Sequence, residues 1–210
     1  MPGPGPWCLI EAVALRLIEH AEELTDLDRA IGDGDHGLNM KRGAEAVLAK
    51  ADALAALPLA ELLRQSGMTL VMTVGGASGP LYGTLLLELG KALQGQPEPP
   101  DRASLAAALG QGVAAVKARG RSDGGQKTLL DVLIPLQQAL ASPQPVSGLG
   151  PLALAAAEAT TPMLATRGRA SFLGERSIGH MDPGARSSAL MLVALLEALT
   201  AAPAAPQLTP

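Results

Sequence analysis

Aromatic residues are almost missing from this sequence of 210 residues, which contains one tryptophan, one tyrosine and one phenylalanine. Its formal net charge is −4. Nucleic-acid binding depends on aromatic stacking platforms and a basic surface, so we expect no nucleic-acid partner. Strand-forming β-branched residues rarely cluster, whereas alanine, leucine and glycine dominate. The composition therefore predicts helices rather than strands.

Cysteine and long apolar runs are also scarce. Cys8 is the only cysteine, which excludes an internal disulfide and a thiolate zinc cluster. No run approaches the ~18 uninterrupted apolar residues of a membrane span, and the richest, residues 189–196, is stopped by Glu197. The first six residues, Met-Pro-Gly-Pro-Gly-Pro, lack the features of a secretory signal. We therefore expect a cytoplasmic protein with no membrane partner.

Apolar residues recur at helical spacing and predict one all-α domain over residues 1–210, with 1–6 and 203–210 frayed. Proline and glycine clusters separate about eight helices. We expect these over residues 7–24, 38–56, 59–73, 80–94, 101–119, 127–141, 150–166 and 185–201. Pro135 should kink or shorten its helix, and a strand over residues 129–134 is the alternative. Three polar, glycine-rich loops, residues 25–37, 120–127 and 167–186, are the expected places for a ligand site.

The first of these loops carries three aspartates, Asp28, Asp33 and Asp35, the last two separated by Gly34. Two carboxylates ~5 Å apart repel by about 3 kcal/mol at an effective dielectric of roughly 20, so their convergence requires a cation. Oxygen ligands select magnesium, manganese or calcium over zinc. An EF-hand is excluded, because its final glutamate would be Ala44. The sequence predicts a divalent-metal site, with a solvated acidic turn that caps the next helix as the alternative.

Two further glycine-rich segments are candidate phosphate sites. Residues 74–81 (Val-Gly-Gly-Ala-Ser-Gly-Pro-Leu) run into a predicted helix with Ser78 near its N-cap. Exposed amides at such a helix start bind anions, and an ordinary turn between helices is the alternative. Residues 120–128 look like a P-loop, but Gln126 separates the second glycine from Lys127 and no βαβ unit is visible. A P-loop NTPase is therefore disfavoured.

The third loop is rich in arginine. Guanidinium groups suit phosphate oxygens, and this loop contains Arg167, Arg169, Arg176 and Arg186. We expect at least one of them to serve solubility alone. Asp182-Pro-Gly is a turn signal. For His36 and Asn39, which follow the aspartates, a structural hydrogen-bonding role and a phosphate or metal-shell role both remain open.

Several motifs, taken in order, resemble the L subunits of dihydroxyacetone kinases. They are residues 32–40 (Gly-Asp-Gly-Asp-His-Gly-Leu-Asn-Met), 67–69 (Gly-Met-Thr), 74–81, 127–128 (Lys-Thr) with Asp131, and 168–185. The resemblance extends over about residues 9–200. It implies an antiparallel up-and-down barrel of eight helices, with a nucleotide site among the loops at one end.

The resemblance also implies roles for individual residues. Asp28, Asp33 and Asp35 are expected to hold two Mg²⁺ ions that bridge the phosphates of ADP or ATP. Arg169 is expected to meet the phosphates as the catalytic residue. The positions expected to line the nucleotide are His36, Gly37, Leu38, Asn39, Gly76, Ala77, Ser78, Gly120, Leu129, Arg169, Asp182, Pro183 and Gly184. Residues 120–126 match the family only loosely.

The function implied is that of an ADP-binding subunit. The bound ADP acts as a coenzyme that accepts a phosphoryl group from a multiphosphoryl carrier subunit (M) and passes it to dihydroxyacetone on a separate K subunit. The chain has no room for a K domain, which favours this form over the fused ATP-dependent kinase. Two alternatives stay open: a nucleotide-sensing module that binds a transcriptional regulator, and the L-type subunit of an ATP-dependent kinase with another substrate.

Overall fold

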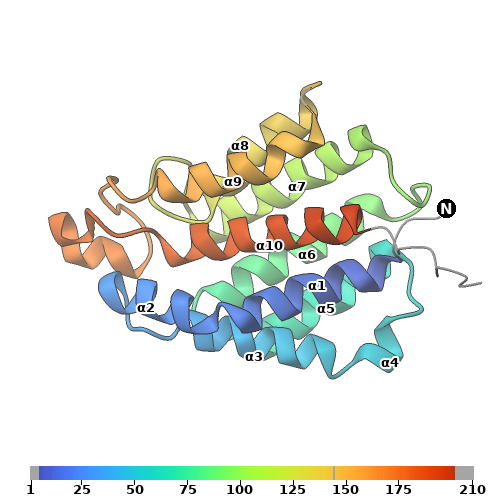
Figure 1. Cartoon of the computed structure of the whole chain (residues 1–210), viewed down its shortest axis with the longest axis horizontal. Helices are drawn as coiled ribbons and strands as arrows, with labels where there is room; N and C mark the ends of the chain where they lie inside the picture. Colours follow the sequence, from blue (N-terminus) through green and yellow to red (C-terminus); the bar gives the residue numbers. More distant parts are fainter. Residues whose placement is uncertain (1–4, 144, 202–210) are drawn as a thin grey trace, which may run out of the picture.

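The computed structural model describes residues 5–143 and 145–201, where all regular elements are helices (Figure 1). The α-helices are α1 Pro6–Glu19, α2 Ala21–Ile31, α3 His36–Leu48, α4 Ala51–Leu54, α5 Leu59–Thr73, α6 Ser78–Leu93, α7 Arg102–Gly120, α8 Leu130–Ala141, α9 Leu149–Glu158 and α10 Pro183–Thr200. The 3-10 helices are η1 Val146–Gly148 and η2 Arg169–Ser177. The predicted all-α class is confirmed. Of the ends expected to fray, residues 1–4 and 203–210 lie outside the described residues, whereas Pro6 begins α1.

The long helices close into a ring (Figure 1). α1 packs on α3 and α3 on α5, after which α5 to α10 follow one another in chain order until α10 packs back on α1. α2 follows α1 after a single residue, His20, and packs on α3. Because neighbouring helices run in opposite directions, α3, α6, α8 and α10 all begin at the same end of the barrel. The predicted up-and-down barrel is confirmed.

Aliphatic side chains at helical spacing fill the inside of the ring. Leu24, Val116 and Leu130 are completely buried there, and full burial of one such side chain contributes about 1.5–3 kcal/mol. Small residues let the helices approach closely: a Cβ on Gly83 would lie 2.9 Å from the carbonyl oxygen of Gly67, which joins α6 to α5. A core with Tyr82 as its one buried aromatic residue within the described ranges is possible because the helices pack at such short distances.

Two helix boundaries near one end of the barrel differ from the sequence prediction. The predicted loop 25–37 is helical as far as Ile31, because Asp28 and Ile31 continue the buried face of α2. The loop is therefore residues 32–35 alone. In the predicted loop 167–186, Asp182 is the N-cap of α10 and its Oδ2 accepts the amide of Ala185 at 2.7 Å. Pro183 takes the first helical position, so Asp182-Pro-Gly starts a helix and is not an isolated turn.

Pro135 lies inside α8 without ending it, and the helix continues to Ala141. The alternative strand over residues 129–134 is wrong, because these residues form the start of α8. Within the described ranges, no helix has both the length and the apolar character that crossing a membrane requires.

Candidate functional site

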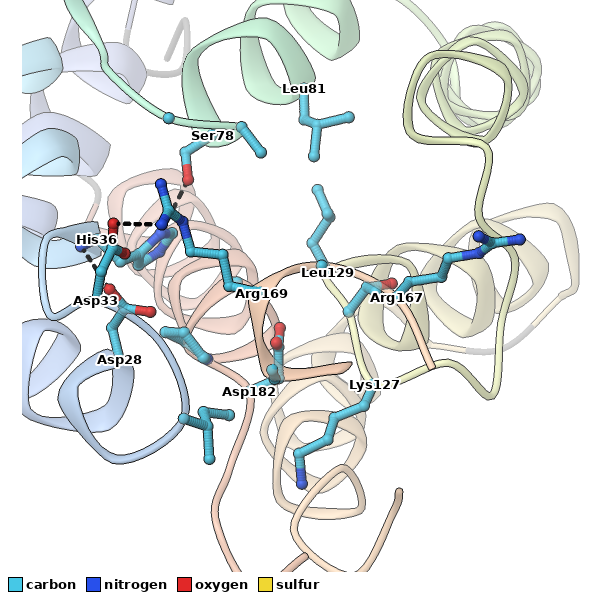
Figure 2. Close-up of a pocket in the computed structure, with 18 of the residues that line it drawn as sticks. Asp28, Asp33, His36, Ser78, Leu81, Lys127, Leu129, Arg167, Arg169 and Asp182 are labelled. Carbon is cyan, nitrogen blue, oxygen red and sulfur yellow. Dashed lines mark hydrogen bonds and ion pairs between the residues drawn. The ribbon is translucent and has the colours of Figure 1, made fainter. Parts of the chain in front are cut away.

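A pocket opens at the end of the barrel where α3, α6, α8 and α10 begin (Figure 2). The first turns of these helices and the loops before them line it. The lining residues are Asp28, Ile31, Asp33, Asp35, His36, Gly76, Ala77, Ser78, Leu81, Tyr82, Lys127, Thr128, Leu129, Arg167, Gly168, Arg169, Ala170, Asp182, Pro183 and Gly184. Helix starts carry partial positive charge and unpaired amides, so this convergence favours an anionic ligand.

The structure brings the three predicted aspartates together. Asp28, Asp33 and Asp35 each offer a carboxylate oxygen, and these atoms lie within 4.8 Å of one another. Asp28 lies on α2, and its Oδ2 accepts hydrogen bonds from the amides of Asp35 at 2.8 Å and His36 at 3.1 Å. These bonds fix the 32–35 turn against the helix. The three oxygen donors fit a hard cation such as Mg²⁺, which also retains positions for phosphate oxygens and water.

Glycine is required at two positions of this turn. Gly34, between the two loop aspartates, has φ of 73°, a conformation that other residues adopt only with strain. A Cβ on Gly32 would lie 2.1 Å from Asp28 Oδ1, so a side chain there would displace the carboxylate. The alternative of a simple capping turn is not supported, because Asp35 precedes α3 as its N-cap residue without a side-chain capping bond.

Arg169 meets the aspartate cluster from η2. Its Nη1 lies 2.9 Å from Asp33 Oδ2, and its side chain is 64% exposed; Figure 2 shows the guanidinium beside Asp33. Arg167 also lines the pocket. Arg186 instead pairs with a glutamate of α2 at 2.6 Å, and Arg176 is exposed outside the lining. Two of the four arginines thus reach the site.

His36 uses both ring nitrogens within the protein. Nδ1 lies 2.9 Å from Ser78 Oγ and Nε2 lies 3.0 Å from Ser187 Oγ. Burial lowers the pKa of His36 to about 4, although the nearby carboxylates of Asp28 and Asp35 oppose the change. The ring is therefore neutral at pH 7. It joins the first turns of α3, α6 and α10 and brings no positive charge to the pocket.

Another part of the pocket is apolar. Leu81 and Leu129 point toward one another in Figure 2, away from the aspartates. Tyr82 also lines the pocket, and its hydroxyl donates to the carbonyl of Gly184 at 2.8 Å and contacts Ser187 Oγ at 2.8 Å. Burial raises the pKa of Tyr82 above its usual value. The pocket therefore suits a ligand with an anionic group at one end and an uncharged, partly apolar group at the other.

Asp182 is a partly buried carboxylate in the pocket wall. Its Oδ2 caps α10, and its amide donates to Thr160 Oγ1 at 3.0 Å. Burial raises the pKa of Asp182 to about 7, and the neighbouring charge of Asp131 adds to this effect, while backbone hydrogen bonds and Lys127 oppose it. Near neutral pH, Asp182 is therefore present in both protonation states.

Replacing Asp182 with asparagine should raise the melting temperature more at pH 8 than at pH 5, without nucleotide or Mg²⁺. Because the folded-state pKa of Asp182 lies above 3.8, the unfolded chain releases this proton first, and stability falls as the pH rises from about 4 to about 7. Asparagine caps a helix about as well and cannot ionise. Scanning calorimetry at the two pH values measures the shift, and equal shifts would contradict the assignment.

Four residues predicted to line the nucleotide lie outside the pocket lining: Gly37, Leu38, Asn39 and Gly120. A Cβ on Gly37 would lie 1.9 Å from the carbonyl oxygen of Ala21, so this glycine packs α3 against α2. Leu38 is 57% exposed, Asn39 is buried, and Gly120 ends α7. Their contacts with a nucleotide stay predictions.

The sequence reasoning gave no role to several residues that line the pocket. Leu81 was predictable, because it lies three residues after Ser78 and shares its helix face. Lys127 and Thr128 belong to a family motif whose spacing indicates no role, and Tyr82 reaches the pocket through the packing of α6 on the rest of the barrel.

Comparisons with known proteins identify the family of this chain. Residues 30–197 match the DAK2 domain. The chain is 43% identical to the PEP-dependent dihydroxyacetone kinase 1, ADP-binding subunit DhaL of Listeria innocua over 87% of this chain and 89% of that relative. It is 42% identical to the corresponding subunit of the PEP-dependent dihydroxyacetone kinase of Escherichia coli, over 82% of this chain and 85% of the relative.

A solved structure shares the fold. It is the dihydroxyacetone kinase of C. freundii in complex with AMP-PNP and Mg²⁺, which superimposes with a TM-score of 0.72 at 29% identity over 94% of this chain. This chain spans about a third of the C. freundii chain, 34%. The matched family covers most of the sequence, including the aspartates at 33 and 35, the 74–81 segment and the arginine-bearing loop. This chain therefore belongs to the DAK2 domain family.

Proposed function

We propose that this chain is the ADP-binding subunit of a cytoplasmic, multi-subunit dihydroxyacetone kinase. In this proposal ADP stays bound as a coenzyme, accepts a phosphoryl group from a phosphocarrier subunit and passes it to dihydroxyacetone on a K subunit. The observation that carries it is the cluster of three carboxylates within 4.8 Å at the mouth of a pocket formed by helix starts. Support comes from relatives that are named as ADP-binding subunits of PEP-dependent dihydroxyacetone kinases.

The aspartates would hold Mg²⁺, and we propose two ions. Asp28 is held in place by two backbone amides, so it would anchor the metal site, while Asp33 and Asp35 extend it toward the open side of the pocket. Bound Mg²⁺ would neutralise the diphosphate oxygens. The chain itself supplies the orientation, because the 32–35 turn is fixed before any ligand arrives.

Two further groups would receive the phosphates. The N-cap residue of α6 is Ala77, which has no side-chain group to cap the helix, and Ser78 Oγ is engaged with His36. The first amides of α6 are therefore free for an anion. Arg169 supplies a guanidinium next to Asp33. In the loose transition state of phosphoryl transfer, charge accumulates on the equatorial oxygens, and fixed donors of this kind stabilise it.

The nucleoside would lie against the apolar part of the pocket. Leu81 and Leu129 provide two apolar surfaces that face one another (Figure 2), and residues 182–184 form the adjoining wall. A purine ring is flat and largely apolar on its faces, so it fits such a slot, while the diphosphate reaches the aspartates. The pocket thus matches both ends of ADP.

Reconstitution with K and carrier subunits tests the choice of phosphoryl donor. We expect dihydroxyacetone phosphorylation to require this chain, to draw on phosphoenolpyruvate through the carrier, and to proceed with ADP present only in the amount bound to the subunit. ATP added without the carrier should give no sustained turnover. Product is measured by coupled reduction of dihydroxyacetone phosphate. Steady ATP consumption in the absence of the carrier would overturn the coenzyme role in favour of an ATP-dependent kinase.

A further inference from the structure

Lys127 is a buried cation in the pocket wall, and the proposed function assigns it no role. Its side chain is only 1% exposed, and its Nζ donates to the carbonyl oxygens of Thr160 at 2.8 Å, Thr161 at 3.2 Å and Met163 at 3.1 Å. Its backbone has φ of 62°, in the left-handed region. A buried ammonium and a strained backbone both cost stability, so the rest of the structure holds Lys127 in place firmly.

The carbonyls that Lys127 binds lie at the base of a loop. The carbonyl oxygen of Thr161 also accepts the amide of Gly179 at 2.9 Å, and Thr160 Oγ1 accepts the amide of Asp182 at 3.0 Å. Residues 160–163 and 179–182 are therefore joined side by side. Residues 164–178, which lie between these two segments, form a closed loop that we name the Arg169 loop. The two joined segments are its neck, and Lys127 binds there.

The Arg169 loop reaches from this neck to the aspartate cluster. Ala165, Ala170 and Leu173 pack on Ile31 at the end of α2, two residues before Asp33. Arg169 itself forms its ion pair with Asp33. The loop is thus held by the apolar contact with α2, by the Arg169–Asp33 ion pair and, at its neck, by backbone hydrogen bonds and the ammonium of Lys127. Removal of the Lys127 ammonium would take away the donor that the carbonyl oxygens of residues 160, 161 and 163 share.

We infer that Lys127 is a positioning residue, whose ammonium fixes the neck of the Arg169 loop and thereby holds Arg169 over the aspartates. In Figure 2 its amine points away from the Arg169 guanidinium, and it donates to the carbonyl oxygens at the neck. It therefore acts on the ligand through Arg169 rather than by contact. The inference rests on the proposed function, because it assigns to that site the residue that sets its geometry for a diphosphate.

The first test measures hydrogen exchange and needs no nucleotide. In Lys127→Met, amides of residues 164–178 should exchange faster than in the parent chain, while those of α5 and α6 should not change. Lys50→Met is the matched control. Lys50 Nζ donates a hydrogen bond of 2.9 Å to Thr69 Oγ1, and neither residue lines the pocket. Unchanged exchange in the Arg169 loop of Lys127→Met would overturn the inference.

The second test asks whether Lys127 acts through Arg169. Each single variant, Lys127→Met and Arg169→Ala, should weaken Mg-ADP binding by about 10-fold, the range expected for a lost charge-assisted hydrogen bond. The double variant should bind no more weakly than Arg169→Ala alone. A purely structural role would not produce this result, because independent losses multiply to about 100-fold. Multiplying losses in calorimetric titrations would therefore reject the positioning role.

A second variant covers the case in which Lys127→Met does not fold. Thr160→Val removes the hydroxyl that accepts the amide of Asp182, loosens the same neck and leaves every charge in place. The same two criteria apply to it: faster exchange in residues 164–178, and no additional loss of Mg-ADP binding when combined with Arg169→Ala. Failure of the parent chain to bind Mg-ADP would reject the proposed function, while the exchange result would still decide whether Lys127 holds the loop.

Discussion

The Asp33→Ala variant is expected to lose all of the stabilisation that Mg-ADP gives the parent chain. A ligand that binds only the folded state, present at 100 times its dissociation constant, stabilises a protein by about 2.7 kcal/mol. Asp33 is one of three carboxylates whose oxygens lie within 4.8 Å of one another, so its loss removes both a metal ligand and the negative charge that attracts the metal. Thermal unfolding with and without Mg-ADP measures the effect, and EDTA should abolish the shift in the parent chain as well.

Asp33 is the best of the three aspartates for this experiment. Asp28 is buried and accepts two backbone amides, so its replacement would damage the fold as well as the metal site. The Asp33 side chain is 37% exposed and pairs only with the exposed Arg169, and such surface pairs contribute about 0–1 kcal/mol. The Asp33→Ala variant should therefore unfold near the parent temperature when no ligand is present.

Asp26→Ala is the matched control for Asp33→Ala. Asp26 is 61% exposed, lies on α2, forms an ion pair with Arg29 and is not a member of the aspartate cluster. This variant also removes one negative charge near the site, but it should keep the full response to Mg-ADP. A complete response in Asp33→Ala, or an equal loss in both variants, would mean that the aspartate cluster does not bind the metal.

The barrel itself was implied by the family resemblance. Local pattern was sufficient to predict an all-α chain of about eight helices, because proline and glycine clusters separate them. It failed where a polar residue continues a buried helical face. Asp28 lies on the inner face of α2, and the pattern of apolar residues stops there, so the sequence suggested a loop. Burial of that carboxylate is compensated by the amides of Asp35 and His36, bonds that form only once the 32–35 turn folds back.

The aspartate cluster and the start of α6 could be predicted from local sequence. They depend on short spacings, such as Asp33-Gly34-Asp35, and on the start of α6 at Ser78. The role of Lys127 was not predictable, since its partners lie 33 to 36 positions further along the chain. The neutral state of His36 was not predictable either, because it follows from the burial of the ring, which depends on packing between elements distant in sequence.

Arg169→Ala is expected to lower the rate of phosphoryl transfer in the reconstituted kinase by about 100-fold or more, the usual cost of removing one preorganised donor at developing charge. The guanidinium lies 2.9 Å from Asp33, so it reaches the place where the terminal phosphate would meet the metal ligands. In the transition state, charge is spread over the equatorial oxygens of the phosphoryl group in transfer, a group that bound ADP lacks. The rate should therefore fall further than the affinity for Mg-ADP.

Arg176→Ala separates this role from the general effect of positive charge on the same loop. Arg176 belongs to the same 3-10 helix, is exposed and does not line the pocket, so its replacement removes an equal charge without touching the ligand. We expect that variant to keep the parent rate. Arg169→Lys should recover only part of the rate, since an ammonium cannot form the planar, bidentate contact of a guanidinium. Equal rates for Arg169→Ala and Arg176→Ala would exclude Arg169 from the transfer step and leave it an electrostatic partner of Asp33.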